Sequence, residues 1–249
     1  MNEKKNNNGR IGLSTTDWLV EAILERIHKG EWTPGMMIPS ERTLIAEFDV
    51  SRLALREALS RLRALGVLEI RHGKGSTVRP VDAAVLGRLF PLMVSMQGEQ
   101  TFQHVFEVRV GLELRTAALA AERRTDEDLR RLQELIEEFR ANLGNPAKSV
   151  AADLEFHVQV ARSTGNPLFT LLLQSISGFV YFVQQLACGN RPGTREAALA
   201  AHEEIAAAIR DGHADRARAA MESHLYTSAE RILGSGVLST SEAAVPAAP

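Results

Sequence analysis

Apolar residues recur every three to four positions through most of this chain, and this spacing predicts helices rather than strands. The pattern is clearest from residue 81 to about residue 233, where clusters of glycine, asparagine and proline divide the chain into segments of helical length. Helices are predicted at Ala83–Ser95, Phe102–Arg123, Asp126–Asn142, Lys148–Ser163, Pro167–Leu186, Arg195–Arg210 and Ala214–Leu233. We therefore expect an all-α antiparallel helical bundle in this part of the chain.

The segment from residue 34 to residue 80 has a different pattern. Ser40 is placed to cap a short helix, and Ser51 to cap a second helix that ends before Gly66. Two helices joined so closely predict a helix-turn-helix. Two short strands are predicted after Gly66, at Val67–Ile70 and Thr77–Val78. The predicted fold is therefore mostly α: an N-terminal winged helix-turn-helix with a small β-hairpin wing, then the helical bundle.

The second helix of this segment has two chemically different faces. Its leucines recur at the spacing of a buried stripe: Leu55, Leu59 and Leu62. Polar and basic residues recur on the other side: Arg52, Arg56, Ser60 and Arg63. Arg52 and Arg56 lie near the N-terminus of the helix, the end that a recognition helix inserts into the major groove of DNA. A basic face can also be an ordinary solvated surface, so the charge distribution matters.

Charge is segregated along the chain. The formal net charge is only -2, yet residues 51 to 80 contain seven Lys or Arg against two acidic residues. Residues 1 to 80 contain thirteen basic and ten acidic residues, a surplus of +3, which leaves -5 for the remainder. A basic module joined to an acidic one suits a protein whose first part contacts nucleic acid and whose second part does not.

Four motifs in the N-terminal module resemble the GntR family of bacterial transcription regulators. They are Pro39-Ser40-Glu41-Arg42, Val50-Ser51-Arg52, Arg56-Glu57-Ala58-Leu59 and the predicted wing tip His72-Gly73-Lys74-Gly75. The resemblance implies a double-stranded DNA operator as the partner. By the same resemblance the DNA contacts fall on Arg42, Ser51, Arg52, Arg56, His72, Gly73 and Lys74.

Length and composition set broader limits. The 249 residues, 45% of them hydrophobic, allow two modest domains. We expect a disordered N-terminus at 1–12, the DNA-binding domain at 13–80, the helical domain at 81–233 and a disordered tail at 234–249. We find no signal peptide and no apolar run near the roughly 20 residues that cross a membrane. With a single cysteine, Cys188, the chain is expected in the cytoplasm and away from membranes.

Four ionisable side chains lie on helix faces that are otherwise apolar: Asp153, His157, His202 and His224. His202 and His224 lie about ten and twelve residues from the predicted turn between their helices, so an antiparallel pairing places them at nearly matching heights. One such histidine is usually a satisfied core residue, but four buried ionisable groups call for a common partner. The donor set suits a divalent metal ion, with zinc first and nickel, manganese or iron(II) as alternatives.

The second half of the chain is similar to the FCD effector domain of the FadR-type subgroup. The similarity rests on Asp153 and His157, on the Gly165-Asn166-Pro167 turn, and on His202 and His224 with their apolar neighbours. It implies that the four residues hold a metal and that a small carboxylate effector binds beside it. Arg109 is the candidate to bind the effector carboxylate, with a structural salt bridge as the alternative.

These expectations combine into one function and two alternatives. We expect a homodimeric transcription regulator that is not an enzyme, a repressor released from its operator by a sugar acid or organic acid bound at the metal. One alternative is a metal-dependent hydrolase, since an open metal site can activate water. The other is a DNA-binding protein whose metal is only structural.

Overall fold

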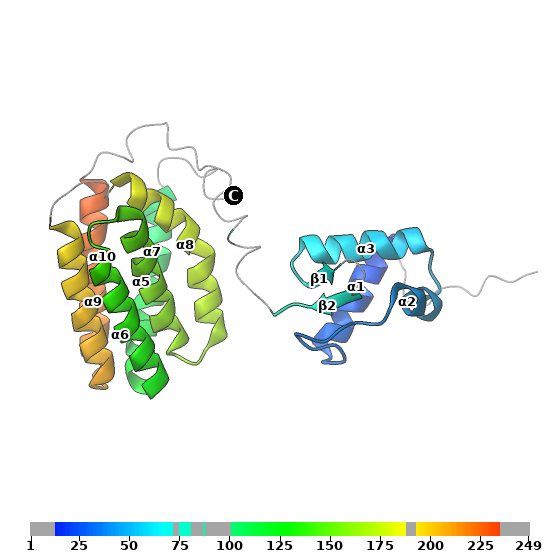
Figure 1. The fold of residues 1–249 in the computed structure, drawn as a ribbon, viewed down its shortest axis with the longest axis horizontal. Helices are drawn as coiled ribbons and strands as arrows, with labels where there is room; N and C mark the ends of the chain where they lie inside the picture. The colour runs from blue at the N-terminus through cyan, green and yellow to red at the C-terminus, as the bar shows by residue number, and fades with distance from the viewer. Residues whose placement is uncertain (1–12, 72–74, 81–86, 88–100, 188–192, 235–249) are drawn as a thin grey trace, which may run out of the picture. The chain divides into compact units, whose positions relative to one another are not determined.

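The computed structural model describes residues 13–71, 75–80, 87, 101–187 and 193–234. The chain divides into two compact units, Met1–Val85 and Leu86–Pro249 (Figure 1). Three predictions fall outside the described residues. They are the helix at Ala83–Ser95, of which only Gly87 is described, and the disordered ends, of which only Gly234 is described. Cys188 also lies outside them.

The N-terminal unit contains a helix-turn-helix and a two-stranded antiparallel sheet. Its elements are α1 (Thr15–His28), α2 (Glu41–Phe48), α3 (Arg52–Ala64), β1 (Leu68–Arg71) and β2 (Gly75–Val78). The strands pair from Leu68↔Val78 to Arg71↔Gly75. β1 lies one residue later than its predicted range, and β2 begins two residues earlier than predicted, at Gly75, which has a φ of +90°.

Helix α1 was not predicted from the sequence. Ser14 caps it by accepting a hydrogen bond from the backbone N–H of Asp17 at 3.1 Å. Leu19 and Ile23 on its inner face are fully buried, and the helix packs against α3. The apolar core of this unit therefore joins α1 to the predicted leucine stripe of α3, whose Leu55 and Leu62 are fully buried.

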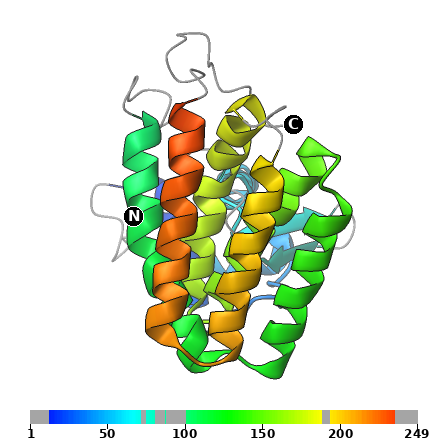
Figure 2. The same ribbon diagram turned by 90° about the vertical axis from the view of Figure 1, so that its left-hand side faces the viewer.

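The C-terminal unit is an antiparallel bundle of long helices. They are α5 (Thr101–Arg123), α6 (Asp126–Ala141), α7 (Pro146–Arg162), α8 (Pro167–Ala187), α9 (Thr194–Arg210) and α10 (Ala214–Leu233). Their bounds agree with the predicted ranges to within two residues. α10 packs between α5 and α9, and α7 packs against both α6 and α8 (Figure 2).

Helix α7 lies at the centre of this bundle. Asn145 caps its N-terminus, and Pro146 occupies the first turn, where a missing N–H costs nothing. Almost every residue from Ser149 to Ala161 is buried. Two apolar clusters share this helix, one with α5, α6, α9 and α10 and the other with α5, α8 and the end of α10. Polar residues on α7 therefore face the interior on more than one side.

Helix α8 is more apolar than the sequence analysis expected. Pro167–Gln185, 19 residues with a mean hydropathy of 1.3, is long and apolar enough by composition to cross a membrane. The sequence analysis expected no apolar run near this length, and this stretch qualifies by length and composition alone. Leu173, Ile176 and Val180 of this helix are buried against α5 and α7, so the same composition also fits a core helix of the bundle.

Candidate metal centre and DNA-binding surface

The predicted recognition helix of the N-terminal unit is α3, the second helix of its helix-turn-helix. Ser51 caps it by accepting a hydrogen bond from the backbone N–H of Ala54 at 3.1 Å. Because the helix N-terminus carries unsatisfied N–H groups and a partial positive charge, this end favours anions such as phosphate. Arg52 and Arg56 are both exposed on this end of the helix. Leu53 beside them is 78% exposed, an apolar side chain that the sequence analysis did not single out.

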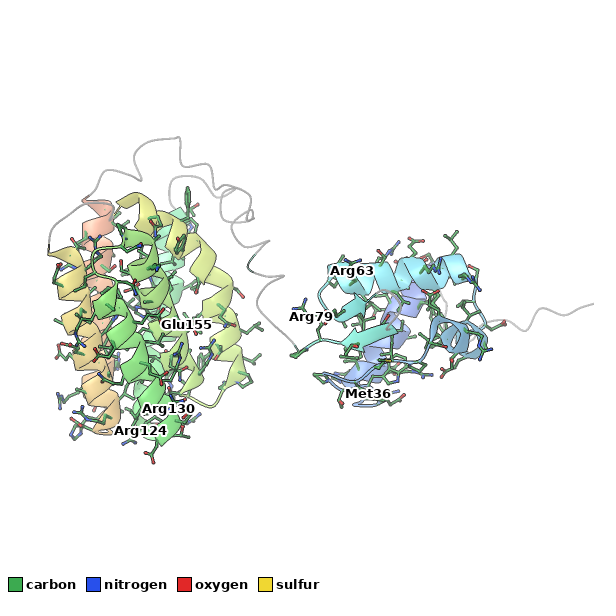
Figure 3. The ribbon with its side chains drawn as sticks, viewed as in Figure 1. Met36, Arg63, Arg79, Arg124, Arg130 and Glu155 are labelled. Carbon is green, nitrogen blue, oxygen red and sulfur yellow. The ribbon has the colours of Figure 1, made fainter. Side chains whose placement is uncertain are left out.

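The arginines of this unit differ in how far their charge is already compensated. Arg61 forms ion pairs with Asp17 at 2.5 Å and with Glu57 at 2.7 Å. The Nε of Arg56 donates to Glu41 at 3.0 Å, but its side chain is 61% exposed. Arg42, Arg52 and Arg63 are exposed and have no ion pair within the described part of the chain; Arg63 lies on the outer side of α3 (Figure 3). The cationic surface on α3 is therefore carried mainly by Arg52 and Arg63.

The wing is described only in part. Strands β1 and β2 are in place, and the residue Met37 forms an isolated bridge with Thr77. His72, Gly73 and Lys74, the predicted DNA contacts at its tip, lie outside the described residues. Their role stays a prediction.

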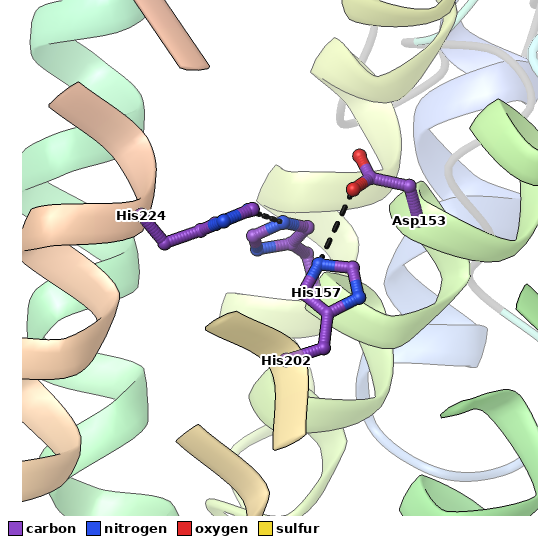
Figure 4. Close-up of side chains that lie close together, drawn as sticks. All are labelled: Asp153, His157, His202 and His224. Atoms are coloured by element: carbon purple, nitrogen blue, oxygen red, sulfur yellow. Dashed lines mark hydrogen bonds and ion pairs between the residues drawn. The ribbon is translucent and has the colours of Figure 1, made fainter. Parts of the chain in front are cut away.

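The four predicted metal ligands lie together at the centre of the C-terminal unit. Asp153 and His157 extend from α7, His202 from α9 and His224 from α10 (Figure 4). One potential ligand atom from each lies within 4.8 Å of all the others. His157 Nε2 and His224 Nε2 are 3.2 Å apart, and His202 Nε2 is 3.2 Å from Asp153 Oδ1. Tetrahedral coordination with bonds of about 2.0–2.1 Å separates ligand atoms by similar distances.

Burial makes this cluster costly without a common partner. All four side chains are less than 9% exposed, and His202 is fully buried. Neither ring nitrogen of His202 has a well-formed hydrogen bond among the described residues. The ring of His202 also stacks on Phe156 at 4.2 Å between centroids, so the ring has little freedom to turn away. Unsatisfied nitrogens that converge on one point fit a divalent cation.

The protonation states of the cluster suit metal binding. Burial lowers the pKa of His202 and lowers that of His224 well below 6.5. Both imidazoles are therefore neutral near pH 7 and keep a lone pair for a metal. Burial alone would raise the pKa of Asp153, but the contact with His202 and the nearby rings of His157 and His224 outweigh it and hold the pKa well below 3.8. Asp153 is thus an anionic oxygen donor.

Two residues that the sequence analysis missed support the cluster from neighbouring helices. Gln184 of α8 donates through Nε2 to Asp153 Oδ2 at 3.1 Å. Glu113 of α5 contacts His157 Nδ1 through one carboxylate oxygen and Arg109 through the other. A carboxylate on Nδ1 fixes the ring so that Nε2 points at the metal position. Glu113 could have been suspected from its spacing, because it lies one turn from Arg109 on an apolar face.

Arg109 is buried in an ion pair. Its Nε lies 2.6 Å from Glu113 Oε1, and the two residues are only 7% and 1% exposed. Burial by itself would raise the pKa of Glu113, but Arg109 and then His157 lower it to about 2. Arg109 also lines a narrow apolar crevice with Phe102, Phe106 and Phe179. The structural salt bridge that the sequence left as an alternative is thus present.

Comparisons with known proteins agree with this architecture. Residues 15–78 match the family described as bacterial regulatory proteins, gntR family, and residues 104–227 match the FCD domain. The chain is 31% identical over 211 residues to the HTH-type transcriptional regulator LutR of Bacillus subtilis, covering 83% of this chain and 95% of that protein. It is 30% identical over 218 residues to the HTH-type transcriptional repressor NanR of Escherichia coli K12. The match covers 83% of this chain and 80% of that protein.

Solved structures show the same fold. A chain described as Streptococcus agalactiae GntR superposes with a TM-score of 0.63 at 27% identity, over 85% of this chain and 98% of that one. E. coli McbR/YncC superposes with a TM-score of 0.50 at 18% identity, over 89% of this chain and 98% of that one. At this identity the similarity concerns the fold alone. The relatives are transcriptional regulators and not enzymes. The chain belongs to the GntR family of transcriptional regulators, with a helix-turn-helix domain followed by an FCD domain of the FadR-type subgroup.

Proposed function

We propose that this chain is an effector-responsive repressor: it binds an operator through α3 and the wing, and a small carboxylic acid bound at a metal in the FCD domain releases it. The observation that carries the proposal is the buried cluster of Asp153, His157, His202 and His224, joined in one chain to an exposed cationic recognition helix.

Arg52 and Arg56 are the proposed base-reading side chains of α3. Both are exposed at the N-terminal end, where arginine can grip the O6 and N7 atoms of guanine. The Glu41 contact uses Nε of Arg56 and leaves its two terminal nitrogens for DNA. Arg42 and Ser51 are proposed to contact phosphate and so to fix the position of the helix on the duplex. His72, Gly73 and Lys74 are proposed to contact the duplex from the wing.

The proposed metal is divalent, with zinc first. Three imidazoles and one carboxylate suit zinc, and the donor types alone also admit nickel, manganese and iron(II). When bound, the ion supplies a positive point to which an acid group can coordinate. Gln184 and Glu113 hold Asp153 and His157 in place for it. The role of Arg109 as an effector ligand stays a prediction, since Glu113 already engages its Nε.

Release from the operator requires a coupling between the two domains. We propose a homodimer in the cytoplasm that places two α3 helices on a palindromic operator, as helix-turn-helix dimers do. The acid must bind one arrangement of the dimer better than the other, and couplings of this kind amount to about 1–3 kcal/mol.

The test begins with zinc-loaded, full-length protein. Duplexes are selected from a random DNA library, and a panel of sugar acids and organic acids is screened by thermal shift. Fluorescence anisotropy then measures affinity for the selected duplex with and without each acid that binds. We expect weakening of roughly 5- to 150-fold, the equivalent of that coupling. The proposal is contradicted if no duplex is selected, or if no acid that binds the protein changes its affinity for DNA.

A structural metal is the second candidate, and the burial of all four ligands favours it. In that case removal of zinc by a chelator lowers the melting temperature, while no acid alters DNA affinity in the loaded protein. The hydrolase alternative is not retained, because the relatives are regulators.

A further inference from the structure

A small cavity of about 40 Å³ lies directly beside the candidate metal centre. Asp153 and His224 form part of its wall, so a ligand there can reach the metal position. Arg195, from the first turn of α9, and Arg231, from the last turn of α10, also line it. The cavity therefore has a metal-binding part and a part with two guanidinium groups.

Among the described residues, the hydrogen-bond partners of the two arginines are neutral. Arg195 Nε donates to the backbone carbonyl of Leu143 at 2.6 Å, and Arg231 Nη1 donates to that of Thr194 at 3.3 Å. Neither has a carboxylate partner within the described ranges, unlike Arg109, whose charge is matched by Glu113. Because a carbonyl orients a guanidinium group without neutralising it, both charges stay available to an anion.

A charge count indicates what the cavity would bind. Asp153 is the single carboxylate among its described lining residues. With a divalent ion, Asp153 leaves a charge of +1 at the metal, which one carboxylate group neutralises. Two arginine charges then remain unmatched in a half-buried setting, where unpaired charge is costly. Guanidinium groups pair best with carboxylate or phosphate, through two parallel hydrogen bonds.

We propose that the effector carries a second acidic group, and that Arg195 and Arg231 bind it while the first acidic group occupies the metal. The ligand class is thus a dicarboxylic acid or a phosphorylated carboxylic acid, and these two arginines set the selectivity against monocarboxylic acids. A cavity of this size holds only a few water molecules. A larger ligand therefore requires the half-buried side chains of Arg195 and Arg231 to rotate. The inference rests on the proposed function and narrows its effector.

Matched acid pairs test the second acidic group directly. Isothermal titration calorimetry on zinc-loaded, full-length protein compares L-malate with 3-hydroxybutyrate, and D-glucarate with D-gluconate. Each pair differs by one carboxylate on the same carbon skeleton. 6-Phosphogluconate distinguishes a phosphate from a carboxylate as the second group. We expect the diacid or the phosphorylated acid to bind at least about tenfold more tightly than its monoacid, a difference of about 1.4 kcal/mol.

Two variants assign the preference to the arginines. Arg195→Gln and Arg231→Gln each keep a side-chain N–H for the backbone carbonyl but remove the charge. Each is expected to abolish most of the preference while zinc content and monoacid affinity are unchanged; Arg195→Lys and Arg231→Lys restore part of it. Arg218→Gln is the matched control, an exposed arginine on α10 away from the cavity, and it leaves the preference intact.

The outcomes separate this inference from the proposed function. If monoacids bind zinc-loaded protein as tightly as their diacids, or if the preference survives in both Gln variants, the inference is overturned and the metal-dependent effector site stands. If neither kind of acid binds, or binding does not require zinc, both are overturned.

Discussion

The two units of this protein place their charged side chains in opposite ways. In the N-terminal unit, Arg52 and Arg63 are exposed on α3, outside the cluster of buried apolar side chains. In the C-terminal unit, Asp153 and Glu113 are 4% and 1% exposed and lie among apolar side chains. The first unit would keep its core if its proposed DNA-binding residues were removed. In the second unit, the proposed metal ligands are part of the core.

This difference determines how each unit can be tested. Exposed charges contribute little to folding, since surface ion pairs are worth about 0–1 kcal/mol. Their removal should therefore report on DNA binding alone. Buried charges are different, because removing one partner leaves the others desolvated and unpaired. Substitutions in the bundle must be interpreted from metal binding and stability together.

The largest effect is expected for His202→Ala in the buried cluster. Loss of one of four ligands should lower zinc affinity by more than the roughly 100-fold that loss of an outer partner can cost. Elemental analysis of the purified variant should give a zinc content near zero, whereas one zinc ion per chain is expected for the unsubstituted protein. The cavity left beside Phe156 also lowers stability, so the melting temperature without metal is recorded for both proteins.

His213→Ala is the control for this substitution. His213 is exposed at the start of α10 and makes no side-chain capping bond, so its loss should leave zinc content unchanged. Retention of one zinc per chain in His202→Ala would contradict the role of His202 as a metal ligand.

A smaller effect is expected for Arg52→Ala on the exposed surface. Loss of a base-reading arginine should weaken binding to the selected duplex by about 1–3 kcal/mol. The melting temperature should stay the same, because Arg52 is exposed and has no ion pair among the described residues. Fluorescence anisotropy measures the first quantity and circular dichroism the second.

Arg63→Ala provides a matched comparison on the same helix. Arg63 is exposed but lies at the C-terminal end of α3, so it should alter affinity less and equally for all sequences. Equal losses for the two variants, with no change in sequence preference, would exclude a base-reading role for Arg52.

The sequence predicted the helices of the C-terminal unit more accurately than the elements of the N-terminal unit. In the bundle, turn residues and apolar stripes placed every described helix within two residues, because both signals are local. In the N-terminal unit, α1 was missed although Ser14, Leu19 and Ile23 carry the usual signals of a capped amphipathic helix. The start of β2 was misplaced because the segment from Gly75 to Val78 is defined by its pairing with β1.

The sequence also predicted only part of the candidate metal centre. The spacing on α7, α9 and α10 predicted that the polar residues face inward, and the rings of His202 and His224 do lie adjacent, with centroids 4.8 Å apart. Glu113 and Gln184 could not be assigned in this way, since they reach the cluster from α5 and α8. Periodicity gives the face of a helix, whereas the partner across an interface depends on how the helices pack.

The substitution Glu113→Gln measures how far this outer partner matters. The amide keeps an oxygen that accepts from His157 Nδ1, but it loses the charge that Arg109 matches. We expect zinc affinity to fall by about tenfold, which is the lower end of the loss caused by removing a residue that orients a metal ligand. Competition with a chromophoric chelator measures it. Glu155→Gln is the control, because Glu155 pairs with Arg162 on the outer part of α7 (Figure 3). Equal zinc affinity in both variants would leave Glu113 as a partner of Arg109 alone.

The smallest expected effect concerns Ser51, which belongs to both the fold and the proposed DNA surface of the N-terminal unit. Its oxygen caps α3, while its O–H remains able to donate to phosphate. Ser51→Ala should lower the stability of this unit by about 1 kcal/mol through loss of the cap. Ser51→Asp should restore that stability, since aspartate caps equally well and suits the positive end of the helix.

The ranking of the two variants in operator affinity should be the reverse of their ranking in stability. Aspartate at position 51 places a negative charge against phosphate, so its operator affinity should fall below that of the alanine variant even though its melting temperature is higher. Thermal melts and anisotropy titrations on the same samples give both rankings. If stability and affinity instead fall together across the two variants, Ser51 contributes to DNA binding only by holding α3 in place. The separation between fold and function at this exposed surface would then be weaker than burial suggests.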